Sequence, residues 1–235
     1  SYFTLKDDLN DGVSHVCLKT GKTKLLASIS RVVNECGRIQ EGNLHHLNHC
    51  LISPSGKYVL FIHRFFLNGK RIDSLLMYNI ENDRLTKLVP NSMVSHYCWV
   101  NDNMAFGFLK PNGQPSGYYT IDTKSGNLSR INNEDLDRFG DGHPTALKNK
   151  IIADTYPGRD RFQHLICFNL ESGDTDVLGS FYSPIQYFGE GRCDLHPRLS
   201  ANKKRIYFDS VHSGQRQLCY MPLPEMLQIQ KTWMR

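Results

Sequence analysis

Four histidines recur at nearly even intervals along this chain of 235 residues. His49, His96, His143 and His196 are 47, 47 and 53 residues apart. Each of these histidines precedes a turn and then an apolar, strand-like run. A fixed period of this length is typical of repeat proteins, in which each repeat folds as one supersecondary unit. The spacing therefore predicts a repeat architecture in which the four histidines occupy equivalent positions.

Each repeat also predicts several short β-strands. The strand-like runs that follow the histidines are residues 57–64, 104–109, 151–155 and 205–210. They are rich in Val, Ile, Tyr and Phe, and Gly or Asn turns separate them from further apolar stretches. Four short strands in a repeat of about 40–50 residues are typical of a β-propeller blade. The predicted fold class is all-β: a β-propeller with four full blade units of four strands and a partial N-terminal unit, which a larger ring would complete.

Net charge, apolar stretches and cysteine content restrict the class of protein that the sequence predicts. Because the repeats continue along the chain, residues 1–235 are expected to form one domain, with a helix only in the tail at 224–233. The net charge of +5 is spread without a Lys/Arg run, which argues against a nucleic-acid partner. No apolar stretch reaches the length of a membrane span. Seven cysteines without a C-x-x-C pair favour free thiols and a cytoplasmic location, although a longer N-terminus could carry a signal peptide.

The repeated histidines are expected to share one face of the ring with other polar side chains. In a propeller, the loops before the inner strands and after the second strands lie on the same face. The groups expected beside the four histidines are His45, His46, His63, Arg64, Asp154, Tyr156, Arg192, Asp194 and Asp209. Imidazole and carboxylate groups together suit Mn, Fe, Zn or Ni. The pattern predicts a site for a divalent transition metal or a substrate. The alternative is a structural network that joins neighbouring repeats.

Two stretches carry a resemblance to a known family. NHCLISPSGKYVLFIHR (48–64) and CDLHPRLSANKKRIYFDSVHSGQRQLCYM (193–221) resemble blades of TolB-type propellers. With the DGHP segment (141–144), they are more narrowly similar to the oligogalacturonate lyase family. This resemblance implies a seven-bladed propeller with a manganese-type ion and β-elimination from uronate-containing oligosaccharides. Similar propellers also occur among proteins linked to bacterial surface-polysaccharide synthesis, so a role there is a related expectation.

The resemblance also implies roles for individual residues. The implied metal ligands are His143, His196 and Asp194, joined by His96. The implied proton acceptor is His49 or His46, and the implied partner of the substrate carboxylate is Arg192 or Arg64. The residues expected to contact the rest of the substrate are His45, His63, Asp154, Tyr156 and Asp209.

The chain departs from the family at one ligand position. The family places a glutamine and two histidines before one inner strand, where this chain has GRCDLH (191–196), with one histidine and one aspartate. The function predicted is thus a carbohydrate-active propeller whose partner is an acidic oligosaccharide or another anionic small ligand. If it is an enzyme, it is predicted to be a metal-dependent lyase. The alternative is a non-catalytic propeller that binds a protein or a glycan.

Overall fold

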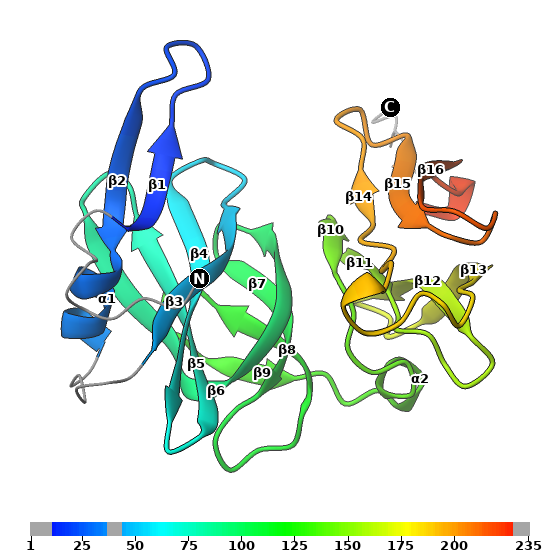
Figure 1. The fold of residues 1–235 in the computed structure, drawn as a ribbon, viewed down its shortest axis with the longest axis horizontal. Coiled ribbons are helices and arrows are strands. Elements are labelled where there is room, and N and C mark those ends of the chain that lie inside the picture. The colour runs from blue at the N-terminus through cyan, green and yellow to red at the C-terminus, as the bar shows by residue number, and fades with distance from the viewer. Residues whose placement is uncertain (1–10, 37–43, 228–235) are drawn as a thin grey trace, which may run out of the picture. The chain divides into compact units, whose positions relative to one another are not determined.

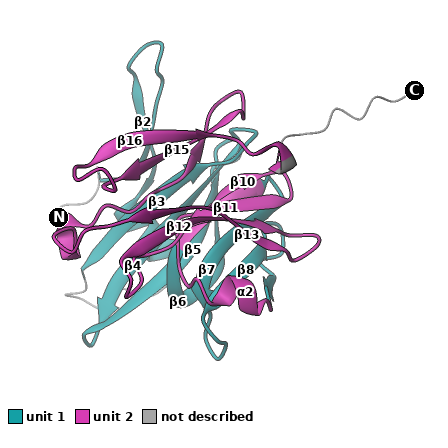
Figure 2. Cartoon of the chain, turned by 90° about the vertical axis from the view of Figure 1, so that its right-hand side faces the viewer, with its two compact units in different colours: residues 1–95, 101–131 teal, residues 96–100, 132–235 magenta. Residues whose placement is uncertain are grey.

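The computed structural model describes residues 11–36 and 44–227, and most of their regular structure is β-strand (Figure 1). The chain divides into two compact units (Figure 2). Unit 1 comprises residues 1–95 and 101–131, and unit 2 comprises residues 96–100 and 132–235. The single domain expected over residues 1–235 stays a prediction. Among the described residues, no helix has the length and apolar character that crossing a membrane requires.

Unit 1 contains a two-stranded sheet and most of a seven-stranded sheet. Its elements are β1 (Gly12–Val16), β2 (Thr23–Ser28), α1 (Ile29–Cys36), β3 (His45–Ile52), β4 (Tyr58–Leu67), β5 (Lys70–Asn79), β6 (Arg84–Asn101), β7 (Met104–Lys110), β8 (Gly117–Asp122) and β9 (Leu128–Arg130). The 18-residue strand β6 pairs with β5 through residues 84–92 and also neighbours β7 in the sheet order. One strand therefore closes one predicted repeat and opens the next, which merges two repeats into a single sheet.

Unit 2 contains a four-stranded and a three-stranded antiparallel sheet. Its elements are α2 (Glu134–Asp137), β10 (Thr145–Leu147), β11 (Lys150–Asp154), β12 (Phe162–Asn169), β13 (Thr175–Tyr182), β14 (Arg198–Leu199), β15 (Arg205–Ser210) and β16 (Gln217–Pro222), with 3-10 turns at η2 (Gly189–Gly191) and η3 (Glu225–Leu227). The sheet β10–β13 matches one predicted four-stranded repeat. The last repeat has three strands within the described residues, so the number of complete blades stays a prediction.

Helix α1 corrects the prediction that no helix occurs before the tail. Ile29, Val32 and Val33 follow the i, i+3, i+4 pattern and are buried. Val32 packs with Leu26 and Phe61 in the core of unit 1. Three apolar positions in an eight-residue helix are too few to stand out as a periodic pattern. Of the predicted tail helix, residues 228–233 lie outside the described residues.

The burial of the strands explains where polar side chains can collect. In β15, Ile206 and Phe208 are buried between more exposed neighbours, as expected for a strand with one covered face. In β11, the four residues 151–154 are all buried, and this strand lies between β10 and β12. A strand covered on both faces carries any polar residue at its end into the interior. Asp154 is that residue, and the candidate site forms around it.

Candidate functional site

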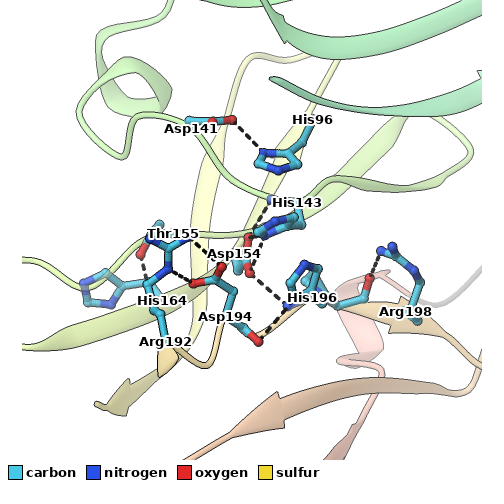
Figure 3. A network of polar contacts seen from close by, with 11 residues as sticks. His96, Asp141, His143, Asp154, Thr155, His164, Arg192, Asp194, His196 and Arg198 are labelled. Carbon is cyan, nitrogen blue, oxygen red and sulfur yellow. Dashed lines mark hydrogen bonds and ion pairs between the residues drawn. The ribbon is translucent and has the colours of Figure 1, made fainter. Parts of the chain in front are cut away.

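The structure brings three of the predicted metal ligands together in unit 2 (Figure 3). His143 lies two residues before β10, and His196 lies two residues before β14, with Asp194 just upstream of it. One ligand atom from each of these three residues lies within 4.8 Å of the other two. Two imidazole nitrogens and a carboxylate oxygen at this spacing can bind one metal ion.

Asp154 fixes both histidines of this cluster. Its Oδ1 accepts a hydrogen bond from the backbone N–H of His143 at 2.5 Å, and its Oδ2 accepts one from the backbone N–H of His196 at 2.9 Å. Both oxygens also lie 3.0 Å from Nδ1 of His143. Burial raises the pKa of Asp154, but the hydrogen bonds from His143 and His196 outweigh burial and hold this pKa below its usual value.

The ionised Asp154 determines which nitrogen of His143 is available to a ligand. A carboxylate can only accept, so Nδ1 of His143 carries a proton, and in the neutral form of the ring the lone pair is on Nε2. A carboxylate that holds a histidine in this way is the usual support of a metal-binding imidazole. Partial burial and, second, the neighbouring His143 lower the pKa of His196, so the His196 ring is neutral at pH 7. The donor set therefore fits a divalent transition metal.

The backbone of His196 is in a conformation that residues other than glycine rarely adopt. Its φ angle is 44°, in the left-handed region. The hydrogen bond from its N–H to Asp154 helps to hold this conformation. Strained residues of this kind persist where the surroundings over-determine them, and they concentrate at functional sites.

His96 adjoins the cluster through His143. The ring centroids of His96 and His143 are 4.0 Å apart, and those of His143 and His196 are 3.7 Å apart. The Nδ1 of His96 lies 3.3 Å from the carboxylate of Asp141. The three imidazoles thus form a row (Figure 3), but the group of ligand atoms within 4.8 Å of one another contains His143, Asp194 and His196 and not His96.

Arg192 and Tyr156 lie beside the cluster. Arg192 donates to Asp194 through Nε at 2.5 Å and Nη2 at 2.9 Å, and its guanidinium carbon lies 4.3 Å from the centre of the Tyr156 ring. The Tyr156 ring meets His143 edge-on at 6.0 Å. Burial is the main cause that raises the pKa of Tyr156, so its phenol keeps its proton and can donate.

Two predicted substrate contacts of unit 2 have surroundings that differ from the prediction. The Asp154 side chain is 1% exposed and both of its oxygens accept hydrogen bonds, so it supports the histidines instead of contacting a ligand. The half-buried Asp209 lies on β15, where its backbone N–H donates to Leu195, and its carboxylate is not part of the cluster.

The other predicted site residues belong to unit 1. His45, His46 and His49 lie on β3, and His63 and Arg64 lie on β4. In this antiparallel pair, His46 is opposite Arg64, and the register shifts between Asn48 and Leu51. This bulge contains the exposed His49, whose φ angle is 55°.

His45 and His63 form a buried pair rather than a surface for substrate. Each residue is 4% exposed, and Nδ1 of His45 lies 3.0 Å from Nε2 of His63. Burial lowers the pKa of His63 to about 3, which keeps its ring neutral. The pair packs on Phe65, with ring centroids 5.3 and 5.4 Å away. The predicted substrate contacts of His45 and His63 therefore do not fit the structure.

Arg64 also differs from its predicted role, because it belongs to a buried charge network. Its Nε donates to Asp73 at 2.6 Å, and Asp73 also accepts from Arg71 at 2.8 Å and from the backbone N–H of Val94 at 3.0 Å. The Asp73 side chain is 0% exposed. Sequence reasoning missed Asp73 as a partner, although the hairpin register that places it opposite Arg64 is a usable signal.

Comparisons with known proteins agree with the fold. No protein-family model and no curated protein matches the chain. The chain is similar to an oligogalacturonate lyase solved in complex with manganese, with 18% identity over 90% of this chain and 54% of that one and a TM-score of 0.61. It is similar to the oligogalacturonate lyase of Vibrio parahaemolyticus, with 14% identity over 92% and 55% and a TM-score of 0.58. TolB of Acinetobacter baumannii matches with 15% identity over 88% and 45% and a TM-score of 0.57.

The chain spans about half the length of these three solved structures. At such low identity the likeness shows the fold alone. The resemblance of the two sequence stretches to TolB-type proteins and oligogalacturonate lyases is therefore confirmed at the level of the fold.

Proposed function

We propose that this protein is a carbohydrate-active β-propeller with a divalent transition-metal site in unit 2. Its blades have four strands, its substrates are uronate-containing oligosaccharides, and its reaction is β-elimination. Two observations support the proposal: the fold is similar to that of oligogalacturonate lyases, one of which was solved with manganese, and unit 2 contains three ligand atoms close enough together to hold one metal ion.

The observation that carries the proposal is the position of Asp154. One buried carboxylate holds the backbone of His143 and of His196 and fixes the proton of His143 on Nδ1. A structural histidine needs only a hydrogen-bond partner. Here the support uses Nδ1 and leaves Nε2 of His143 as the possible ligand atom, near the imidazole of His196 and the carboxylate of Asp194. Such preorganisation is what a metal site requires.

Each residue of the site has a chemical task under this proposal. His143, His196 and Asp194 would hold a manganese-like ion, which would polarise the uronate carboxylate and stabilise the charge that develops when the adjacent proton leaves. Arg192 uses Nε and Nη2 for Asp194 and keeps Nη1 for the substrate carboxylate. Tyr156 donates to a substrate oxygen. His46 or His49 as proton acceptor stays a prediction from the sequence, and both residues belong to unit 1.

Metal content and product formation test the proposal. The purified protein is analysed for bound metal, titrated with Mn²⁺ by calorimetry, and assayed with oligogalacturonate by the ultraviolet absorbance of the unsaturated product. We expect Mn²⁺ binding and product formation in the unaltered protein and neither in the His143→Ala/His196→Ala variant. The matched control is His164→Ala, because His164 lies on β12 of the same unit and bonds Ser180 at 2.8 Å instead of joining the cluster.

The possible outcomes separate the parts of the proposal. If no transition metal binds, the proposal of a metal site is wrong. If metal and oligogalacturonate bind without an unsaturated product, the lyase reaction fails and the chain is a glycan-binding propeller. If the double variant binds Mn²⁺ as tightly as the His164→Ala control, the assignment of the ligands fails.

A further inference from the structure

A groove lies in unit 1, and none of the residues that line it has a site role assigned from the sequence. It is bordered by the β4–β5 turn, the middle of β6 and the loop after β7, and its volume is about 740 Å³. Small-molecule sites in proteins have volumes of this order. Its lining includes the cationic side chains of Lys70, Arg71 and Lys110, and no acidic side chain of the described part of the chain lines it.

The guanidinium group of Arg71 is held in place by Asp73 and by the backbone of Val94. Its Nε lies 3.0 Å and its Nη2 lies 2.8 Å from the buried carboxylate of Asp73, and Nη2 also donates to the carbonyl of Val94 at 3.2 Å. Among the described residues, Nη1 of Arg71 has no partner, so its two N–H groups remain for a ligand. A guanidinium held in this way loses little conformational freedom when it binds an anion.

The groove has a surplus of positive charge. Asp73 is a single carboxylate between two guanidinium groups, those of Arg64 and Arg71. Lys70 and Lys110 are exposed, and neither forms an ion pair within the part of the chain that the structure describes. Uncompensated cations along a concave surface attract anionic ligands.

The rest of the lining favours a saccharide over a simple anion. Asn68, Asn112 and Gln114 contribute amides, which can donate to and accept from hydroxyl groups. Ile72 and Met93 contribute apolar surface, which can contact the C–H face of a sugar ring. An isolated phosphate would use the cations but neither the amides nor the apolar surface.

We propose that this groove binds a uronate-containing saccharide, with the carboxylates at Lys70, Arg71 and Lys110 and the hydroxyls at the amides. The inference shares a ligand class with the proposed function of unit 2 but none of its residues. The two proposals are therefore independent. The groove can bind the saccharide even if unit 2 binds no metal, and unit 2 can bind metal even if the groove binds no saccharide.

Calorimetric titration with a galacturonate trimer tests the groove. The trimer is titrated into the full chain in a chelating buffer, and again into the His143→Ala/His196→Ala variant, so that the candidate metal site is disabled. We expect binding that weakens with added salt and that falls about tenfold in Lys70→Gln/Lys110→Gln, since this variant removes two of the three cations that would contact the carboxylates. The control Lys19→Gln/Lys22→Gln removes the same charge from the exposed β1–β2 turn and should bind normally.

Three results would overturn the inference. The first is equal affinity of Lys70→Gln/Lys110→Gln and the control, both shown to be folded by circular dichroism. The second is equal affinity for a neutral galactose trimer, which would remove the role of the cations. The third is inorganic phosphate that binds as tightly as the trimer and displaces it, which would make the groove a simple anion site.

Discussion

The two units use the same residue type in opposite ways. In unit 1, His45 and His63 are buried and bond each other, and within residues 11–36 and 44–227 neither has a carboxylate as a hydrogen-bond partner. In unit 2, His143 and His196 are held by the buried carboxylate of Asp154 and lie next to Asp194. The difference shows that a histidine becomes a candidate ligand through the carboxylate that orients it.

The buried carboxylates of the two units, Asp73 and Asp154, also differ in the groups that they bind. Asp73 in unit 1 is neutralised by two guanidinium groups, whereas Asp154 in unit 2 accepts from N–H groups of two histidines. Both acids have a lowered pKa despite burial, which would raise it. We expect Asp73 to act mainly on stability and Asp154 mainly on ligand binding, and the following predictions separate the two.

The largest expected effect is that of Asp73→Asn on stability. Removing the charge leaves Arg64, whose side chain is 15% exposed, and Arg71 without a counter-ion. Breaking a buried ion pair typically costs about 3–5 kcal/mol. Urea unfolding measures the change, and Mn²⁺ affinity should stay unchanged. Asp135→Asn, which removes an exposed pair with Arg138, should cost less than about 1 kcal/mol. A similar loss in both variants would contradict the assigned role of Asp73.

The next effect is a loss of stability in acid that depends on His63. The unfolded histidine takes up its proton near pH 6.5, whereas burial delays protonation of the folded one to about pH 3. Below about pH 6.5 the unfolded state therefore binds more protons, so this contribution to stability falls with pH until about pH 3. Between about pH 7 and 4.5 the loss should be about 2–3 kcal/mol.

Unfolding by urea at several pH values measures this dependence. The slope should flatten in His63→Gln and persist in His164→Gln, which replaces a half-buried histidine. An unchanged slope in His63→Gln would show that other groups cause the acid sensitivity.

The third expected effect is a weaker affinity for metal in the Asp154→Asn variant. Asp154→Asn removes the acceptor that fixes the proton of His143, and losing such a support typically weakens metal binding about 10–100-fold. Calorimetry with Mn²⁺ measures this, with Asp209→Asn as the control because that carboxylate lies outside the cluster. If Asp154→Asn does not fold, Asp194→Asn tests the same cluster by removing a proposed ligand. Full affinity in either folded variant would rule out the corresponding role.

The smallest effect is a gain of stability in His196→Gly. Glycine adopts the left-handed conformation of this position freely, so the change should stabilise the fold by about 0.5–1 kcal/mol while metal binding is lost. Lys203→Gly relieves a similar φ angle of 56° in an exposed turn of the same unit and should keep metal binding. A destabilised His196→Gly protein would mean that the imidazole supports the fold rather than a ligand.

The strand pattern was predictable because it depends on neighbours in the sequence. The runs at 104–109 and 205–210 coincide with β7 and β15 within one residue. Helix α1 was missed because its apolar stripe is short, and the merging of two repeats was missed because it depends on the uninterrupted course of β6. The groove at Lys70, Arg71 and Lys110 gave no signal, since its lining comes from three separate segments.

The sequence by itself determined the repeat, the strands and the recurrence of histidine before them. Through the resemblance to oligogalacturonate lyases, it also indicated His143, Asp194 and His196 as metal ligands, joined by His96. Only the tertiary structure decided that Asp154 supports these residues while His45 and His63 are buried. The physical reason is distance along the chain: Asp154 reaches His143 across 11 residues and His196 across 42. Strand propensity is local, whereas a hydrogen bond between separate segments exists only once the sheets have packed.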